Sequence, residues 1–321
     1  MHLERTNSTL LSIIMPVYNA ENYLRQAIES IVDQSYQQWE LHICDDKSTD
    51  RSWEIIKQFE AIDDRIFIYQ NEENQGKVKS VNSLLERCNG KYLTIHDADD
   101  WSDPKRFGKQ INFLEINQDY VGCGTFFFTH KKNKIVKRQL STDSKKIKSD
   151  LVNSSQIHGP TLVFRSFISN SNNYIYRDYF EDYNEDYDLC VRLAHLGKLT
   201  NLNEYLYHYR SLSGSLSKRH NLKRICSSEI MSYLIKQRIL YGKDDVDKRY
   251  YNEIQNILNK KQKLYDKDKS MPIREHAEIL YHSGFIKAAV IKSLKAILTS
   301  PFKVTNYRLL QFIIRKKLLQ F

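Results

Sequence analysis

The feature that most constrains the fold is a regular alternation of strand-like and helix-like segments in the N-terminal part of the chain. Between the strand-like runs, apolar residues recur at helical spacing, as in residues 21–32, and one helical run ends at Asn89-Gly90, a favourable helix terminus. Strands that alternate with helices are typical of a doubly wound, mostly parallel sheet. We therefore predict an α/β fold whose first four strands occupy residues 12–15, 39–44, 65–69 and 92–96.

Polar residues follow three of these strands directly. The three clusters are Pro16 to Asn19, Asp45-Asp46 and Asp97 to Asp100. In doubly wound sheets, ligands bind in the crevice outside the carboxyl ends of the strands. Because all three clusters occupy that position, we expect them to converge on one edge of the sheet and to form a ligand site.

The last of these clusters places three carboxylates behind an apolar strand. Bare carboxylates are costly to bury without a cation, and oxygen ligands one residue apart suit Mg²⁺ or Mn²⁺ rather than zinc. The alternative is an acidic turn before a helix that starts at Asp103-Pro104. The chain has no GxGxxG after the first strand and no GxxxxGK[ST], so the usual glycine-based phosphate cradles are missing. Acidic groups with a metal would then handle any phosphate.

Cysteine use and hydropathy indicate a cytoplasmic protein. The five cysteines are scattered and form no CxxC pair, which argues against a disulfide framework and against a zinc site. The N-terminal apolar run has no basic lead and breaks at Pro16, unlike a signal peptide. No run of about 18 apolar residues occurs, so we expect no membrane-spanning helix.

Positive charge is concentrated in the C-terminal part of the chain. The net charge is +10, but residues 221–321 hold 21 Lys and Arg against 9 Asp and Glu, whereas residues 1–220 hold 28 against 30. We therefore predict a catalytic or binding domain over residues 1–220 and a basic helical extension over residues 221–321. The asymmetry favours an anionic partner, either a membrane surface or nucleic acid; a solvated helical surface is the alternative.

Apolar residues near the C-terminus recur at helical spacing. They are Tyr307, Leu310, Ile314, Leu318 and Phe321, and Arg308, Arg315 and Lys316 lie largely off their stripe. A basic amphipathic helix of this kind can lie on an anionic membrane surface, so peripheral contact with the inner face of the cell membrane is one interpretation. A terminal helix docked on the protein core is the other.

Four segments follow one another along roughly residues 10 to 215. They are MPVYNAENYLRQAIESIVDQSYQQWELHICDDKSTD, NQGKVKSVN, YLTIHDADDWSDPKRF and YNEDYDLCVRL. Together they resemble the nucleotide-sugar domain of family 2 glycosyltransferases, which have the GT-A fold, and the order and spacing of the motifs make the resemblance specific. The resemblance implies a Rossmann-like sheet, a nucleoside diphosphate sugar as donor, with uridine as the expected base, and Mn²⁺ or Mg²⁺ as cofactor.

The resemblance also implies which residues contact the nucleotide. Pro16, Tyr18 and Asn19 would line the nucleotide pocket, and Asp46 would bind the base, with Asp45 the less favoured of that pair. For each residue, the alternative is a simple role in a turn or as a helix cap.

The resemblance assigns the metal and phosphate contacts to three further residues. Asp97 and Asp99 would form a DxD motif, in which Asp99 binds the metal directly and Asp97 lies nearer the sugar and ribose. Lys77, in NQGKVKSVN, would counter the charge of the nucleotide or its phosphates. The alternative for Lys77 is an exposed lysine in the first turn of a helix, although a cation there opposes the helix dipole.

The segment YNEDYDLCVRL matches the Glu-Asp motif of the family. The match implies that Asp186 is the general base and that Glu185 positions it, whereas Asp188 is interpreted as a cap or a solvent-facing residue. The alternative is that these carboxylates only interact with the helix dipole. His158, in QIHGPT, would line the acceptor pocket; as a lone histidine it has a structural role as its alternative.

These groups suit glycosyl transfer to a saccharide or a lipid-linked saccharide in cell-surface glycan synthesis. One carboxylate takes the proton of the acceptor hydroxyl, and a metal neutralises the departing diphosphate. A single base without an enzyme nucleophile gives direct displacement, so we expect anomeric inversion, and we expect no nucleic-acid partner. The alternatives are a nucleotidyltransferase, which would release pyrophosphate, and a non-catalytic module that binds membrane or nucleic acid through its basic tail.

Overall fold

The computed structural model describes residues 9–132, 134–166, 175–181, 183–212 and 220–318. The chain forms two compact units. The first unit runs to Arg210, apart from a short stretch at residues 131–133, and the second follows Arg210. Each unit has its own hydrophobic core, so the two are described separately.

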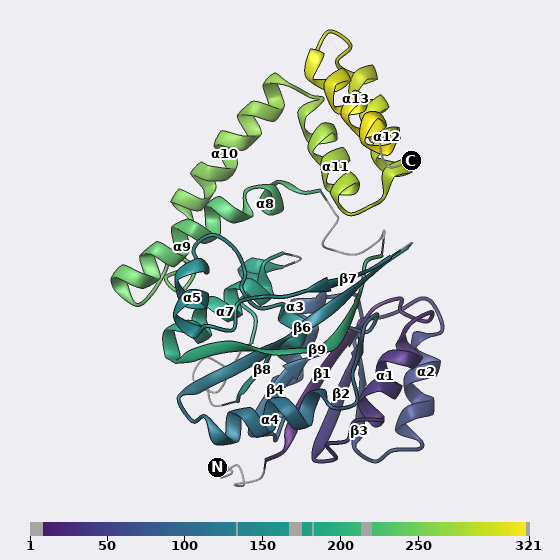
Figure 1. The fold of residues 1–321 in the computed structure, drawn as a ribbon, viewed down its shortest axis with the longest axis vertical. Coiled ribbons are helices and arrows are strands. Elements are labelled where there is room, and N and C mark those ends of the chain that lie inside the picture. Colours follow the sequence, from purple (N-terminus) through teal and green to yellow (C-terminus); the bar gives the residue numbers. More distant parts are fainter. Residues whose placement is uncertain (1–8, 133, 167–174, 182, 213–219, 319–321) are drawn as a thin grey trace. The chain divides into compact units, whose positions relative to one another are not determined.

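The first unit is built on one mixed sheet (Figure 1). Among the described residues, the strand order is β3-β2-β1-β4-β8-β6-β9-β5, and β7 pairs with β6. The pairs among β1, β2, β3 and β4 are parallel, β8 is antiparallel to β4 and β6, and β9 is parallel to β6. The strands are β1 (Leu11–Val17), β2 (Trp39–Asp45), β3 (Ile66–Gln70), β4 (Tyr92–Ile95), β5 (Trp101–Ser102), β6 (Tyr120–Lys131), β7 (Lys134–Arg138), β8 (Val163–Arg165) and β9 (Lys198–Arg210).

Helices connect these strands. Three of them, α1, α2 and α4, place apolar residues in one buried cluster with β1 and β2, whereas α3 contacts the same strands without joining that cluster. The helices are α1 (Leu24–Val32), α2 (Ser52–Glu60), α3 (Lys77–Ser83), α4 (Arg106–Ile116), α5 (Ser144–Asp150) and α7 (Glu185–Leu196), with short 3₁₀ turns η1 (Leu85–Arg87), η2 (Gly159–Thr161) and η3 (Asp178–Phe180).

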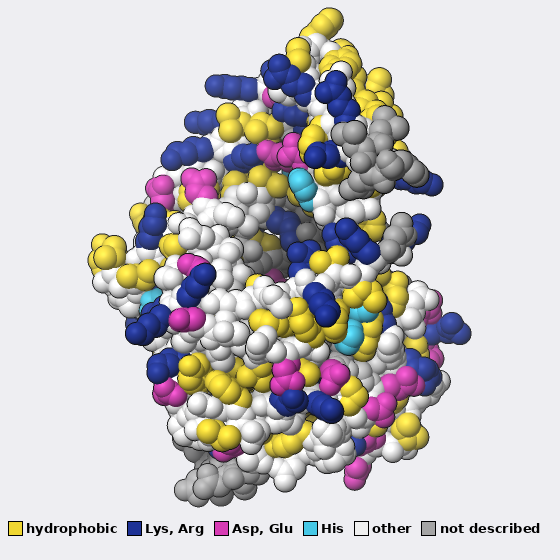
Figure 2. Space-filling model, in the orientation of Figure 1, with side chains coloured by type: hydrophobic (Ala, Val, Ile, Leu, Met, Phe, Trp, Pro, Cys, Tyr) yellow, Lys and Arg dark blue, Asp and Glu magenta, His cyan; other side chains and the backbone are white. Residues whose placement is uncertain are grey.

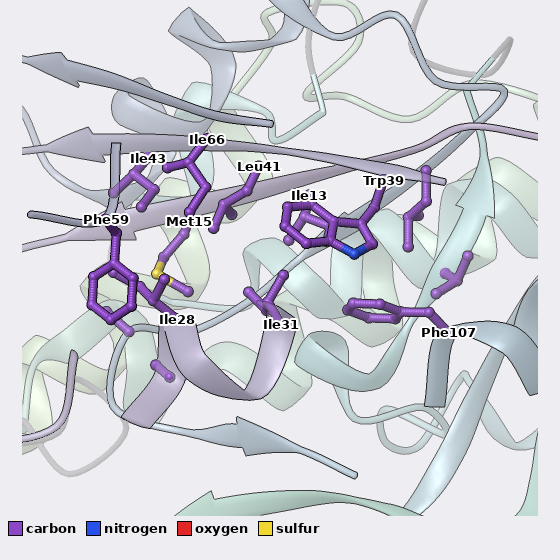
Figure 3. Close-up of a cluster of buried hydrophobic side chains, with 14 of the residues drawn as sticks. Ile13, Met15, Ile28, Ile31, Trp39, Leu41, Ile43, Phe59, Ile66 and Phe107 are labelled. Atoms are coloured by element: carbon purple, nitrogen blue, oxygen red, sulfur yellow. The ribbon is translucent and has the colours of Figure 1, made fainter. Parts of the chain in front are cut away.

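The buried cluster explains why α1 lies on the sheet. Figure 3 shows Ile28 and Ile31 of α1 beside alternate residues of the strands, among them Ile13 and Leu41. Alternate residues of a strand point to the same face, and residues three and four apart share one face of a helix. Each fully buried side chain of this kind contributes roughly 1.5–3 kcal/mol relative to exposure. The packing of α1 on the sheet therefore stabilises β1 and β2, whose ends carry residues of the predicted ligand site.

The close approach of Gly90 to β1 sets the start of β4. A Cβ atom at Gly90 would lie 2.6 Å from the backbone nitrogen of Ser12 and 2.7 Å from the carbonyl oxygen of Leu10. Only glycine therefore lets the chain enter the sheet at this point.

The predicted fold class is confirmed, including the helical C-terminal region. The four predicted strands correspond to β1, β2, β3 and β4, with ends that differ by at most two residues. The pairings among these four strands are all parallel, and in the second half of the sheet β9 is again parallel to β6. The later strands β8 and β5 run antiparallel to their neighbours, which makes the whole sheet mixed.

The second unit is helical. Its last three helices pack around Leu280, Ala289 and Ile313, and Gly284 adopts a positive φ of 90° at the turn between two of them. None of the described helices is both long and apolar enough to cross a bilayer. The helices are α8 (Leu222–Ile225), α9 (Ser227–Tyr241), α10 (Asn252–Lys267), α11 (Met271–His282), α12 (Ile286–Thr299) and α13 (Val304–Leu318).

The helix α13 docks on its neighbours through a face that the sequence did not predict. Asn306 and Ile313 are buried, and the Asn306 side chain donates to the carbonyl oxygen of Ala296 at 2.9 Å. Tyr307 and Ile314, which belong to the predicted apolar stripe, remain exposed. The side chains of Leu318 and Phe321 lie outside the described residues. The reason for the difference is that a buried asparagine supplies hydrogen bonds that no apolar pattern records.

Candidate active site

Three carboxylates converge just after β4. Asp97, Asp99 and Asp100 each place an oxygen within 4.8 Å of the other two. Burial, followed by repulsion from Asp97, raises the pKa of Asp99 to about 6. Burial, followed by repulsion from Asp99 and Asp97, raises the pKa of Asp100 well above its usual range. Three oxygen donors that repel one another at this spacing fit a hard divalent cation such as Mn²⁺ or Mg²⁺.

The three carboxylates differ in their protein partners. Asp100 is held by β9, because its oxygens accept hydrogen bonds from the Tyr207 hydroxyl at 3.0 Å and from the Arg210 backbone nitrogen at 2.7 Å. Asp97 lies 3.1 Å from the Lys77 ammonium. Among the described residues, no other side chain donates to the Asp99 carboxylate or forms an ion pair with it. Asp99 is therefore the member of the group best able to bind a metal, with Asp97 beside it.

Lys77 connects this acidic group to a second one. Its Nζ lies 3.1 Å from Asp97 Oδ1, 3.4 Å from Glu185 Oε1 and 3.8 Å from Asp186 Oδ2. Burial alone would lower the pKa of Lys77, but the Asp186 and Asp97 carboxylates raise it well above its usual range. Lys77 is the first residue of α3 and follows Gly76, which has a φ of +86°. Lys77 is thus a charged and largely buried lysine, with 15% of its side chain exposed, and not an exposed first-turn lysine.

Glu185 and Asp186 begin α7, after Asn184 in the left-handed region at φ 57°. The Tyr176 hydroxyl donates a hydrogen bond to Asp186 Oδ1. Burial raises the pKa of Glu185, although Lys77 opposes that rise. A Cβ atom on Gly159 would lie 2.2 Å from the Asp186 carboxyl carbon, so the backbone of η2 lies directly against this carboxylate.

Asn82 fixes the segment that carries Tyr176. Its Oδ1 accepts from the backbone nitrogens of Ile175 and Tyr176 at 3.0 Å each, and its Nδ2 donates to the Tyr176 carbonyl oxygen at 2.8 Å. Because Asn82 and Lys77 both lie on α3, this one helix positions the hydrogen-bond donor and the cation that meet Asp186. Sequence reasoning missed Tyr176, which belongs to none of the motifs that indicated the site.

Asp46 holds the loop that leads to Lys77. Its two carboxylate oxygens accept from the backbone nitrogens of Gln75 and Gly76 at 2.8 Å each, and from the Asn71 side chain at 2.7 Å. Asp45, its neighbour at the end of β2, is buried and accepts from the Gln70 side chain at 2.9 Å. The Asp46 carboxylate, which already orders this loop, would therefore have to accept the predicted hydrogen bond from a base as well.

The residues at the end of β1 and directly after it form the more exposed part of the candidate site. Pro16 lies in β1, and Tyr18 leaves 49% of its surface exposed. Asn19 has a φ of 50°, and its side-chain oxygen accepts from the backbone nitrogen of Thr49 at 2.8 Å. Asn19 thus joins the loops after β1 and β2, and Tyr18 is the ring that remains available to a ligand.

His158 immediately precedes η2, next to Gly159. Its ring stacks on Phe127 with centroids 4.1 Å apart and meets Tyr209 edge-on at 5.2 Å. Burial, reinforced by Lys77, lowers the pKa of His158 to about 4, so the ring is neutral near pH 7. Its buried Nε2 has no hydrogen-bond partner among the described residues. This unsatisfied nitrogen is compatible with the predicted contact to an acceptor.

Buried arginine side chains fix two elements that carry residues of the site, η2 and α7. Arg106 of α4 donates to the carbonyl oxygen of Pro160 at 2.6 Å, which fixes η2. Asp188 is buried and forms ion pairs with Arg177 and, at 2.9 Å, with Arg192. The interpretation of Asp188 as a cap or a solvent-facing residue is therefore wrong. Arg177 precedes α7 in the sequence, so its ion pair with Asp188 could not be predicted from the position of Asp188 within the helix.

Comparison with known proteins decides the family. The model of the family "Glycosyl transferase family 2" matches residues 12–174. The chain belongs to this family. The Bacillus subtilis protein named "Putative glycosyltransferase EpsE" is 45% identical over 121 residues, but the match covers only 37% of this chain and 44% of EpsE. The chain thus spans less than half of the length of that relative.

A second relative and two solved structures match over more of their length. The Escherichia coli protein WfaP, named as a UDP-Glc:alpha-D-GlcNAc-diphosphoundecaprenol beta-1,3-glucosyltransferase, is 27% identical, with 69% of this chain and 85% of WfaP covered. S. aureus TarS 1–349 in complex with UDP-GlcNAc has a TM-score of 0.59 at 15% identity, with 96% of this chain and 92% of TarS covered. A Pyrobaculum calidifontis mannosyltransferase in complex with GDP-Man and Mn²⁺ has a TM-score of 0.56 at 14% identity, with coverages of 96% and 80%. At such low identity these structures show the fold, which is GT-A.

Proposed function

We propose that this family 2 protein is a metal-dependent, inverting glycosyltransferase that moves a hexosyl or N-acetylhexosaminyl group from a nucleoside diphosphate sugar. The observation that carries the proposal is the meeting of Asp97, Lys77 and Asp186 in one site. The Asp97 carboxylate of the proposed metal site and the Asp186 carboxylate, the proposed base, thus both lie beside the Lys77 ammonium group. This arrangement separates the place for a leaving diphosphate from the place for an attacking hydroxyl.

Each residue has one role in the proposed reaction. A Mn²⁺ or Mg²⁺ ion held by Asp99 and Asp97 would neutralise charge on the departing diphosphate. The acceptor hydroxyl oxygen attacks the anomeric carbon, the bond from that carbon to the diphosphate breaks, and Asp186 accepts the hydroxyl proton. The Tyr176 hydroxyl fixes the Asp186 carboxylate, and Lys77 holds Glu185 beside it. Direct displacement inverts the anomeric centre.

Uridine is our proposed donor base, and a saccharide or lipid-linked saccharide is our proposed acceptor. TarS was solved with UDP-GlcNAc, and WfaP is named for a UDP-sugar donor and a diphosphoundecaprenol acceptor. In the proposed site, Tyr18 would pack on the base, and Asp46 with Pro16 and Asn19 would surround it. We also propose that the enzyme works in the cytoplasm, because buried thiols such as Cys123 fit a reducing compartment.

The test is release of UDP from a panel of UDP-sugars by the purified protein, with and without Mn²⁺ or Mg²⁺. We expect slow, metal-dependent release from at least one donor even without an acceptor, through hydrolysis. A full panel of nucleotide sugars with no metal-dependent binding or release would contradict the proposal. Release of pyrophosphate from UTP in the presence of a sugar 1-phosphate, in a parallel assay, would instead indicate a nucleotidyltransferase.

A second test concerns the base. Asp186→Asn removes the proton acceptor but preserves the shape of the side chain, so transfer should fall by at least about 100-fold, the lower range for loss of a general base. Binding of UDP with Mn²⁺, measured by calorimetry, should change little. Loss of donor binding in this variant would show that Asp186 contacts the donor and is not the base.

A further inference from the structure

The second unit exposes a continuous apolar stripe. On α12, Ile291, Leu294 and Leu298 recur at spacings of three and four residues, and Ile291 and Leu298 are 66% and 82% exposed. Phe302, in the turn after α12, is 98% exposed. We call these four residues the α12 stripe. Figure 2 shows hydrophobic side chains gathered over α12 and α13, with Lys and Arg side chains among them.

Packing within the unit does not use this stripe. The opposite face of α12 is buried through Ala289, Ser293 and Ala296, and it faces α11 and α13. Large aliphatic side chains are thus exposed while small ones fill the contact. Residues needed only for stability would show the reverse order, because burial of an isoleucine or leucine contributes more than burial of an alanine. An exposed apolar stripe of this kind indicates a surface that binds a partner.

The charge around the stripe has a single sign. No Asp or Glu occurs after Glu278, and the described side chains Lys287 and Lys295 are exposed on the same side of α12 as the stripe. On α13, Arg308 and Arg315 are exposed as well. Over residues 279–321 the chain carries eight basic residues and no acidic residue: Lys287, Lys292, Lys295, Lys303, Arg308, Arg315, Lys316 and Lys317.

We propose that the α12 stripe and its basic surroundings bind the surface of an anionic lipid bilayer. The apolar side chains would enter the interface between headgroups and acyl chains, while the lysine and arginine heads remain at the anionic headgroups. Each basic residue near such a surface strengthens binding roughly fivefold. This surface lies on α12 and the turn after it, not on the stripe of α13 that sequence periodicity indicates.

Two other partners fit less well. A second copy of the chain would bring the same uncompensated positive charge against itself, which opposes association through this face. A nucleic acid would satisfy the charge but would leave Ile291, Leu294 and Leu298 without an apolar environment. A bilayer, in contrast to these two partners, offers anionic groups and hydrocarbon within one surface. The inference rests on the second unit alone and does not depend on the donor chemistry of the first.

The test is flotation of the 321-residue chain with two kinds of vesicle, phosphatidylcholine alone and phosphatidylcholine mixed with phosphatidylglycerol. We expect flotation with the anionic vesicles, weaker flotation at high salt and little with the neutral ones. The double variant Ile291→Glu with Leu298→Glu should lower the vesicle partition coefficient by about 100-fold, since each lost side chain accounts for about tenfold. Lys287→Gln with Lys295→Gln should lower it roughly 25-fold.

The matched control is Ile62→Glu. Ile62 is 78% exposed and lies in the first unit, so the same substitution there should leave flotation unchanged. All of these positions are exposed, and circular dichroism and UDP binding should match the unsubstituted protein. Flotation that survives the α12 double variant, or that Ile62→Glu abolishes equally, would overturn the proposal. So would absence of flotation together with a dimer, measured by light scattering, that the α12 double variant dissociates.

Discussion

At the scale of the residue, Lys77 allows two acidic groups to share one site. Asp97, Glu185 and Asp186 all place an oxygen within 4 Å of its Nζ. We predict that Lys77→Met lowers the free energy of unfolding by about 3 kcal/mol, because it leaves partly buried carboxylates without their cation. UDP release should fall by at least tenfold as the carboxylates move apart. Denaturant unfolding and the release assay measure the two effects.

Lys79 supplies the control for this prediction on the same helix. Its side chain is more than half exposed, and its nearest carboxylate, that of Glu181, is 4.0 Å away. Exposed pairs of this kind contribute little, so Lys79→Met should change the free energy of unfolding by less than about 0.5 kcal/mol. Equal effects of the two substitutions would show that Lys77 acts only through the general charge of α3.

Gly159 tests how closely Asp186 must be positioned. A Cβ atom there would meet the Asp186 carboxyl carbon at 2.2 Å, so Gly159→Ala must displace the carboxylate. A displacement of about 1 Å can cost about 100-fold in rate, and we predict a loss of that order in transfer with little change in UDP binding. Steady-state kinetics and calorimetry separate the two.

Gly108 is the matched position for this substitution. It lies within α4, where a Cβ atom would approach Tyr36 no closer than 3.8 Å. Gly108→Ala should leave transfer intact and stabilise the protein by roughly 0.5–1 kcal/mol, since alanine favours a helix over glycine. Full transfer activity in Gly159→Ala would mean that Asp186 tolerates displacement and is not the proton acceptor.

At the scale of the element, Glu40 joins three parts of the sheet. It lies on β2, accepts from the Ser12 hydroxyl of β1 at 2.5 Å and accepts from the backbone nitrogen of Asn89, before β4, at 2.6 Å. Burial opposes ionisation, but hydrogen bonds from His42, Ser12 and Asn89 lower the pKa of Glu40 to about 2. The carboxylate is thus the favoured form in the folded protein.

A lowered carboxyl pKa contributes stability at high pH. The contribution of Glu40 is complete above its ordinary pKa of 4.5 and is lost as the pH falls toward 2. Glu40→Gln should therefore lower the free energy of unfolding by about 2–3 kcal/mol near neutral pH, and by less as the pH falls below 4.5. Urea unfolding across this range measures the change. Glu60→Gln, at an exposed position, is the control; a constant difference for Glu40→Gln would contradict the linkage.

The parts of the fold that could be predicted are those with a periodic signal. The strands β1 to β4 follow from apolar runs between helical segments, and the acidic group at Asp97 follows from its place after β4. Tyr176 and Arg106 could not be predicted, because no local pattern records their contacts with Asp186, 10 residues away along the chain, and with Pro160, 54 residues away. The same is true of α13, where the buried Asn306 decided which face docks.

At the scale of the whole molecule, the two units differ in composition in a way that allows each to be followed separately. All three tryptophans, Trp39, Trp53 and Trp101, lie in the first unit, whereas the described part of the second unit is helical. Tryptophan emission therefore reports unfolding of the first unit alone. Far-ultraviolet circular dichroism reports both units, with a large share from the helices α9 to α13.

This difference permits a prediction about ligand binding in a chain that contains both units. UDP with Mn²⁺ at about 100 times its dissociation constant should stabilise the first unit by about 2.7 kcal/mol, which corresponds to a rise of about 5–10 °C in its melting temperature. Tryptophan emission should show this shift, while part of the helical signal melts at an unchanged temperature. No shift in emission would contradict the donor site in the first unit. An equal shift of the entire helical signal would show that the two units unfold together, because separate cores predict separate responses to a ligand that binds only one of them.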